Sequence, residues 1–378
     1  MFFILFGFLI AADSVDPNWS YRVHVHEPFF LETGNRLIAV SDRGEIFFIN
    51  NHNLKLAKVN ASGKTEGVIA RKGWAPGELD YPLHMEVRGE LLFVKDVGKN
   101  CISIWNTDGT FVKEYPTDGH AFSLAMGSVT DGVVLADWDY SEDPQKPVSL
   151  TLFNTNMEKQ KVLWHTRRLS DIGGSVTRVP NRVLKFNPAK DQYFLAAGKD
   201  GKTLFISEPG DSLKITVVDA VSGNVIKTIS RVIPRQPYDR VWAKKEMRLW
   251  QAHTLEEDTP IKMTIEEDFG DVFPLVRSMF VAADGRMAVS LWTDRPDQKR
   301  AYLIFDDRGE ESPSSLSMAA LDRVIGFTGD AAIVTTFDNV NDEAGFASIP
   351  RAAVNRFVEK NPLGYDGSQL PFNLFVVP

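Results

Sequence analysis

Cysteine is almost absent from this sequence, which contains a single one, Cys101. One cysteine can form neither an intrachain disulfide nor a paired-cysteine metal site, so the packed core must supply the stability of the fold. Cys101 opens a run of alternating apolar residues. We therefore expect it to pack as a small hydrophobic side chain rather than to act as a nucleophile.

An excess of positive charge is also missing. The chain has 42 Lys and Arg against 50 Asp and Glu, a formal net charge of -8. General nucleic-acid binding needs a basic face that neutralises phosphates, so we expect no nucleic-acid partner. With 43% hydrophobic residues, the composition is typical of a soluble globular protein.

No hydrophobic run is long enough to cross a bilayer, which takes about 20 residues, so we expect no stable transmembrane anchor. The longest such run at the N-terminus, Phe2 to Ala12, ends in Ala11-Ala12-Asp13-Ser14. Its length and the small residues that follow are typical of a signal peptide, although no Lys or Arg precedes it. We interpret residues 1–18 as an export segment and expect a periplasmic or secreted protein. The alternative is a buried N-terminal strand.

General catalytic motifs are absent as well. The sequence has no phosphate-binding P-loop, no dinucleotide-binding glycine fingerprint, no His-Glu-x-x-His and no Gly-x-Ser-x-Gly. Gly63-Lys64-Thr65 and Gly201-Lys202-Thr203 lack the upstream glycine of a P-loop and fall in expected hairpin turns. These absences favour a protein that binds rather than one that catalyses.

The segment from Gly77 to Tyr115 contains a complete structural unit. A turn with Pro82 precedes a short strand, Gly89-Glu90 turns the chain into an apolar strand that ends at Asp96, and a third strand ends in Asp108-Gly109. Asp-Gly is a hairpin signal that usually has φ > 0 at both central residues. Phe111 to Tyr115 then begins a fourth strand.

This unit recurs along the chain. Five further groups of short strands follow the same order, and the turns at Asp219 to Gly223 and Asp306 to Gly309 repeat the one at Asn106 to Gly109. Six units at a recurring period predict an all-β fold, a six-bladed β-propeller over residues 19–378. The sixth unit shows three clear strands, and Tyr21 to Glu27 is available as its fourth, which would join the two ends of the chain.

One insertion interrupts the period. Residues 239–257 contain no Gly or Pro and place Val241, Trp242 and Leu249 at helical spacing. We expect a helix here that lies on one face of the disc. Five tryptophans, Trp74, Trp105, Trp138, Trp164 and Trp292, fall at expected strand ends, where we expect them to pack between blades. We see no second domain and expect a monomer.

At this point the sequence resembles bacterial six-bladed β-propellers related to NHL-repeat proteins. The resemblance is clearest from Gly73 to Tyr115 and fair over Tyr193 to Ile229 and Phe273 to Trp292. It implies an architecture and no particular reaction, because propellers serve as enzymes, scaffolds and receptors alike.

Superposition of the six units suggests a candidate binding site. The inner strand of each blade begins near one opening of the ring, and five units have a cationic or imidazole side chain near that point. Like charges gathered in an acidic protein are unfavourable unless an anion offsets them. We therefore expect an anionic ligand, bound by charge-assisted hydrogen bonds at the mouth. The candidate residues are His84, His120, Lys190, Arg277 and Arg323.

Two enzymatic alternatives depend on a metal. Because imidazole suits Zn²⁺, His84 and His120 could hold a channel metal, as in the amidating lyases that resemble NHL proteins, and His24 with His26 could form a two-ligand clip. Glu27-Pro28-Phe29-Phe30 with Asp42 is similar to the opening of lactonase-type propellers, in which a Glu helps to bind Ca²⁺. A further set of acidic residues could hold Ca²⁺ through oxygen ligands: Asp137, Asp139, Glu142 and Asp143.

The sequence thus predicts an exported, non-catalytic binding module with an anionic ligand or a protein partner. A metal-dependent lyase or lactonase-type hydrolase, with Zn²⁺ or Ca²⁺ as cofactor, is one alternative. A protein-interaction scaffold is the other, and it requires an exposed apolar patch on one face of the disc.

Overall fold

The structure is a computed structural model. It describes residues 21–25, 37–50, 54–117, 126–130, 132–137, 149–154, 156, 158–165, 176–179, 183–186, 193–241, 262–265, 271–282, 284–292, 299–306, 309–310, 316–319, 323–328, 331–338 and 343–350. The elements within these ranges are β-strands, and helical conformation is confined to Arg240 and Val241. The chain is therefore all-β.

Six four-stranded antiparallel sheets make up most of the molecule. The first two are β2 (Ile38–Val40), β3 (Ile46–Asn50), β4 (Lys55–Val59) and β5 (Thr65–Ala70), then β6 (Pro82–Arg88), β7 (Leu91–Asp96), β8 (Cys101–Asn106) and β9 (Phe111–Pro116). The third and fourth are β10 (Met126–Val129), β11 (Gly132–Asp137), β12 (Ser149–Asn154) and β13 (Lys159–His165), then β16 (Phe194–Ala197), β17 (Thr203–Glu208), β18 (Leu213–Asp219) and β19 (Val225–Arg231).

Both ends of the described chain lie in the sixth sheet. The fifth and sixth sheets are β21 (Val276–Val281), β22 (Met287–Leu291), β23 (Lys299–Phe305) and β24 (Leu316–Ala319), then β25 (Arg323–Thr328), β26 (Ala331–Asp338), β27 (Glu343–Pro350) and β1 (Tyr21–Val25). The expected strand at Tyr21 to Glu27 is confirmed, since β1 pairs antiparallel with β27, Tyr21 opposite Ser348.

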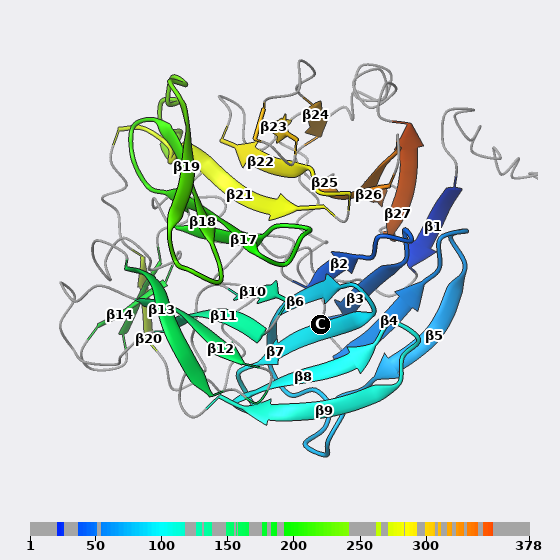
Figure 1. Cartoon of the computed structure of the whole chain (residues 1–378). Helices are drawn as coiled ribbons and strands as arrows, with labels where there is room; N and C mark the ends of the chain where they lie inside the picture. The colour runs from blue at the N-terminus through cyan, green and yellow to red at the C-terminus, as the bar shows by residue number, and fades with distance from the viewer. Residues whose placement is uncertain are drawn as a thin grey trace, which may run out of the picture.

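The sheets are arranged around a common centre (Figure 1). The first strands contact one another in the order β25, β2, β6, β10, β16 and β21. A side-chain contact continues the ring from β21 to β25, because Phe280 stacks on Phe327 with ring centroids 6.4 Å apart. This arrangement is a β-propeller. We call the end of the ring at which the first strands begin the mouth end.

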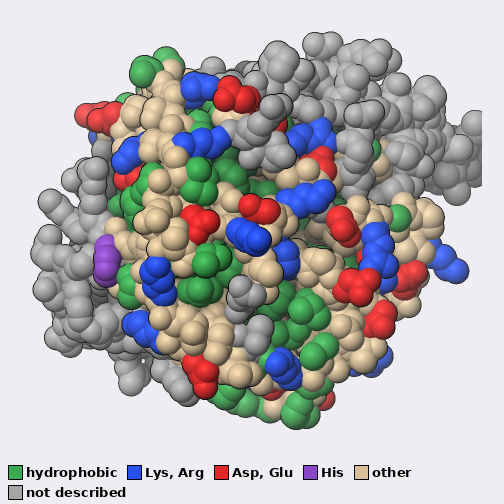
Figure 2. Space-filling view, in the orientation of Figure 1, with side chains coloured by type: hydrophobic (Ala, Val, Ile, Leu, Met, Phe, Trp, Pro, Cys, Tyr) green, Lys and Arg blue, Asp and Glu red, His purple; other side chains and the backbone are tan. Residues whose placement is uncertain are grey.

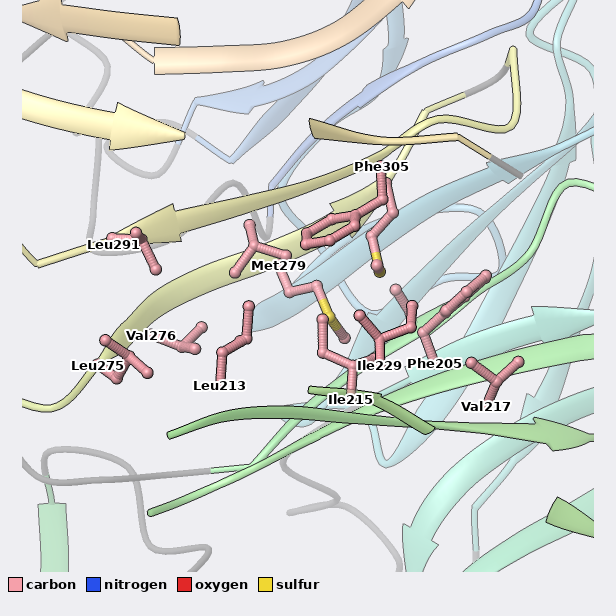
Figure 3. Packing of buried hydrophobic residues seen from close by; sticks show 13 residues of the cluster. Phe205, Leu213, Ile215, Val217, Ile229, Leu275, Val276, Met279, Leu291 and Phe305 are labelled. Carbon is pink, nitrogen blue, oxygen red and sulfur yellow. The ribbon is translucent and has the colours of Figure 1, made fainter. Parts of the chain in front are cut away.

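Apolar layers between neighbouring sheets form the core. The layer between the fourth and fifth sheets is shown in Figure 3, where Phe205, Ile215 and Val217 face Met279 and Phe305. Side chains on a strand alternate between its two faces, so each sheet contributes to the layer before it and to the layer after it. In β7, Leu92 and Val94 join the layer with the first sheet, while Phe93 joins the layer with the third.

A recurring Asn or Asp ends the third strand of five sheets. In four of these sheets its side-chain oxygen accepts one or two backbone N–H groups of the following turn, which satisfies donors where the chain reverses. These residues are Asn60, Asn154, Asp219 and Asp306, and Asn106 ends β8 at the same point. In the Asn106 turn only Gly109 has positive φ, at 94°, and its N–H bonds the Asn106 carbonyl. The expectation of positive φ at both central residues was wrong, because the turn has three residues and a single left-handed glycine.

A small seventh sheet has no counterpart in the repeat. It consists of β14 (Val176–Val179), β15 (Val183–Phe186) and β20 (Lys262–Ile265), with β15 and β20 paired in parallel. These strands come from the connections that precede the fourth and the fifth sheets. Of the segment 239–257, where a helix was expected, the structure describes residues 239–241, and Arg240 and Val241 are helical there. Residues 242–257 lie outside the described residues.

Candidate functional site

Of the five candidate ligand-binding residues, the structure describes the side chains of two, His84 and Arg277. Arg323 opens β25, and its backbone lies opposite Thr335. His120 and Lys190 lie outside the described residues. The two described side chains occupy different positions in their ladders, because His84 is opposite Lys95 whereas Arg277 is the extra residue of a bulge between Val276 and Ser278.

His84 lies in the inner strand β6 beside a buried lysine. Lys95, in β7, is directly opposite His84, and opposite residues of an antiparallel pair point to the same face. This face is turned toward the third sheet, because Phe93, two residues before Lys95, packs there against Val133 and Leu135. Lys95 is 1% exposed, whereas the His84 side chain keeps 24% of its exposure.

Two further charged residues of β6 are on the same face. Glu86 Oε2 lies 3.9 Å from His84 Nε2 and accepts hydrogen bonds from the N–H of Ser128 at 3.0 Å and from its hydroxyl at 3.3 Å. Arg88 donates to the carbonyl oxygen of Ser128 at 2.8 and 3.2 Å. Ser128 belongs to β10, so the inner strands of the second and third sheets are joined by ionised side chains.

Polar contacts also join the third sheet to the fourth. Thr130 donates its backbone N–H to the Gly201 carbonyl at 2.8 Å, and its hydroxyl lies near the carbonyl oxygens of Asp200 and Gly201. Burial lowers the pKa of Arg88, while the carboxylates of Glu86 and Asp200 act in the opposite direction. Arginine nevertheless stays protonated in proteins, so Arg88 remains a cation here.

The second described candidate, Arg277, lies over an aromatic stack. Its guanidinium carbon is 4.6 Å from the centroid of Trp292, whose ring stacks on Phe273 at 5.1 Å with an interplanar angle of 5°. Phe273 in turn contacts Tyr238, with centroids 4.8 Å apart. Burial raises the pKa of the Tyr238 hydroxyl well above its ordinary value. The stack joins the start of the fifth sheet to the segment that follows the fourth.

The connection before β6 crosses the mouth end of the second sheet. Asp96 accepts the N–H groups of Asp80 at 2.7 Å and Tyr81 at 2.9 Å, and Lys99 Nζ donates to the carbonyl oxygens of Ala75 and Glu78. We call residues 71–81 the mouth loop. Trp74 of this loop is 69% exposed, so the expectation that it packs between blades was wrong. Trp105 is buried as expected, and Trp164 packs against a core cluster.

The remaining chemistry is sparse in the part of the chain that the structure describes. It contains no group of three His, Cys, Asp or Glu side chains arranged to hold a metal ion. The possible metal ligands His24, His26, Glu27, Asp137, Asp139, Glu142 and Asp143 have no described side chains. Cys101 is buried as expected, and burial raises the pKa of its thiol. No helix within the described ranges has the length and hydropathy that a membrane crossing requires.

Sequence reasoning missed Glu86, Arg88, Lys95 and Ser128. One signal was present for Lys95, because it follows four apolar residues, Leu91 to Val94, in a strand expected to be buried. Nothing local marks Ser128, whose role depends on which strand packs beside it. The structure therefore adds a buried lysine, and the contacts of Glu86 and Arg88 with Ser128, next to one predicted site residue.

Comparison with known proteins identifies neither a family nor an activity. No protein-family model matches the chain, and no curated protein matches it. Among solved structures it is similar to a Bacteroides fragilis protein described as a candidate for export, with 12% identity over 89% of this chain and 97% of the other, and a TM-score of 0.46. It is also similar to a DUF4221 family member from Bacteroides vulgatus, with 9% identity over 86% and 95% of the chains and a TM-score of 0.47.

Proposed function

We propose that this chain is an exported six-bladed β-propeller that binds an anionic ligand at its mouth end without converting it. In this proposal each of the six four-stranded sheets is one blade, and residues 1–18 direct export. The ligand contacts His84 and Arg277 together with His120, Lys190 and Arg323. The observation that carries the proposal is the position of the half-buried His84 opposite the fully buried Lys95 on an inner strand.

The local charge balance supports an anion. His84, Arg88 and Lys95 share one face of the second sheet with the carboxylate of Glu86, which is bonded to Ser128, and the carboxylate of Asp200 from the fourth sheet also acts on Arg88. Arg88, which stays protonated, raises the local potential, and low dielectric surroundings strengthen the attraction of a cation for a negative ligand. His84 keeps enough exposure to meet such a ligand directly. This imidazole can donate a charge-assisted hydrogen bond when protonated.

The test is a titration with defined anions. Inorganic phosphate, citrate and galacturonate are each added to the purified protein in a calorimeter at low and high salt. We expect at least one to bind, with affinity that falls as salt rises because the contact is ionic. His84→Ala should weaken this binding about tenfold, which corresponds to roughly 1.4 kcal/mol.

Two variants complete the design. Arg277→Ala should also weaken binding. Arg277 lies at the beginning of the inner strand β21, and its guanidinium lies over the ring of Trp292. His165→Ala is the matched control, since His165 is exposed at the end of the outer strand β13. If none of the three anions binds, or if His84→Ala and His165→Ala give equal affinities, the proposal is wrong.

A further inference from the structure

The mouth loop presents two exposed aromatic side chains. Trp74 is 69% exposed and Tyr81 is 60% exposed, and within the described ranges they are the exposed aromatic residues. Large rings left in water lose the benefit of burial, and each offers a flat apolar face that a ligand can cover. Tyr81 directly precedes Pro82, the first residue of β6, so it stands three positions before His84.

The backbone that carries these rings is fixed on both sides. Near Tyr81, the buried carboxylate of Asp96 accepts the N–H groups of Asp80 and Tyr81 and that of Lys99 at 3.1 Å. Near Trp74, Lys99 holds the carbonyl of Ala75, and Glu78 accepts the Ala75 N–H at 2.9 Å. A loop ordered before binding loses little further conformational entropy when a ligand arrives.

A second carboxylate, that of Glu114, fixes the middle of the loop. Glu114 Oε1, in the outer strand β9, accepts the Gly77 N–H at 3.0 Å, the Lys99 ammonium at 2.5 Å and the Ser103 hydroxyl at 3.2 Å. The Lys99 side chain is 5% exposed and that of Glu114 19% exposed, so water competes little for these bonds. The loop is thus bound to the second sheet from its second strand, β7, to its outer strand, β9.

The surroundings of the rings decide what can bind them. Arg71 and Lys72 begin the loop and are exposed, and its two carboxylates are those of Glu78, which accepts the Ala75 N–H, and of the half-buried Asp80. A protein interface needs roughly 800 Å² of complementary surface on each partner. The other large exposed apolar side chains of the described chain, such as Val68 and Val221, lie on strands or turns outside this loop. Two exposed rings in a loop that begins with two exposed cations suit a short chain of sugar rings that carries negative charge.

We propose that the mouth loop binds an acidic oligosaccharide, with Trp74 and Tyr81 stacked on the C–H faces of its sugar rings and its carboxylates directed to Arg71, Lys72 and the mouth. This inference rests on the proposed function, because it names the class of the anion. A single-stranded nucleic acid also combines flat rings with negative charge. It is disfavoured because a single strand carries a phosphate at every nucleotide and needs a positively charged groove that follows them. An acidic oligosaccharide can instead match the two cations of the loop with as few as two carboxylates, and charged side chains of both signs are mixed over the face in Figure 2.

The experiment compares probes of different length and charge. Hexagalacturonate, monogalacturonate, neutral maltohexaose and a six-residue oligothymidylate are each titrated into the full chain. We expect hexagalacturonate to bind at least about tenfold more tightly than monogalacturonate, and maltohexaose and the oligothymidylate to bind more weakly than hexagalacturonate. Trp74→Ala and Tyr81→Ala should each weaken hexagalacturonate about tenfold and leave monogalacturonate unchanged.

Control variants distinguish a loss of ring stacking from a loss of folding and from a loss of the ligand site at His84. Trp74→Phe keeps an aromatic face and should retain most of the affinity, and Val221→Ala, which removes a 60% exposed side chain from the fourth sheet, should change nothing. If His84→Ala weakens monogalacturonate but Trp74→Ala has no effect on the hexamer, the inference fails and the proposed function stands. If Trp74→Ala weakens the hexamer but His84→Ala affects neither probe, the stacking loop stands and the mouth site fails. Tighter binding of the oligothymidylate would overturn the inference in favour of a nucleic acid.

Discussion

Arg88 binds the carbonyl oxygen of Ser128 through two nitrogens of its guanidinium, Nε at 3.2 Å and Nη2 at 2.8 Å. Glu86, two residues earlier on β6, accepts the N–H of the same serine. One residue of the third sheet is therefore held at both backbone polar groups by ionised side chains of the second sheet. Since Ser128 is fully buried, water cannot replace either partner.

Arg88→Ala should consequently reduce the free energy of unfolding by about 2 to 3 kcal/mol, because it leaves the Ser128 carbonyl without these charged donors. Urea unfolding gives the value directly. Arg43→Ala is the matched control, because Arg43 also joins two neighbouring sheets through its ion pair with Glu90, with side chains 57% and 78% exposed. Exposed pairs contribute at most about 1 kcal/mol. If the two variants lose the same free energy of unfolding, the buried hydrogen bonds of Arg88 to Ser128 contribute no more than an exposed ion pair.

The repeat was predictable because its signals are local. Turns at Asn106, Asp219 and Asp306 each follow an apolar strand, and a turn residue acts through hydrogen bonds within a few positions of itself. The pairing of β1 with β27 followed from a count of strands, since the sixth unit lacked one. In contrast, the parallel pair of β15 and β20 joins two separate connections, and such long-range pairing has no local signature.

The candidate site was less predictable, because it depends on register. A shift of one residue turns a strand side chain to the opposite face, so the sequence repeat alone does not fix which cationic side chains lie together. Arg277 illustrates this limit, because the bulge at Val276 and Ser278 gives it a position that no periodic pattern contains. Trp74 shows a second limit. A tryptophan near a strand end can face solvent when buried carboxylates such as that of Asp96 fix the loop backbone.

The turn carboxylates should make stability depend on pH in the acid range. Backbone N–H groups of Ser222 and Val221 hold the pKa of Asp219 below its ordinary value. A lowered folded-state pKa contributes stability that is present above the unfolded pKa and is lost as pH falls through the folded pKa, hence below about pH 4.

Asp219→Asn keeps an oxygen that accepts the same N–H groups, as Asn60 and Asn154 do in other sheets. We expect its unfolding free energy to approach that of the wild type as pH falls from 5 to 2.5, with a constant difference between pH 5 and 7. Chemical unfolding at a series of pH values measures this. A difference that stays constant down to pH 2.5 would show that the carboxylate charge has no role in the turn.

Gly73 controls the order of the mouth loop. A Cβ at this position would lie 1.9 Å from Glu78 Oε2, so Gly73→Ala must displace the carboxylate that accepts the Ala75 N–H. We expect a loss of about 1 kcal/mol, the net value of one hydrogen bond, and faster tryptic cleavage after the exposed Arg71 and Lys72.

Gly210→Ala is the matched control for Gly73→Ala, because a Cβ at Gly210 would meet no atom within 4 Å. It should change the unfolding free energy by less than about 0.5 kcal/mol. Cleavage rates and unfolding curves of the two variants are compared with the wild type. If Gly73→Ala is cleaved no faster than Gly210→Ala, the Glu78 contact does not order the loop.

The strand β1 should keep the sixth sheet from associating with other molecules. It covers β27 along the whole of its own length, from Tyr21 opposite Ser348 to Val25 opposite Ala344. Without β1 the N–H and C=O groups of β27 would form an open edge, and open edges pair with other chains. A variant that starts at residue 26 should therefore unfold at a lower temperature and form dimers or larger species. A variant that starts at residue 19 should remain monomeric, and light scattering after size-exclusion chromatography distinguishes the two. If both variants are monomers with the same unfolding midpoint, the ring does not depend on closure by its first strand.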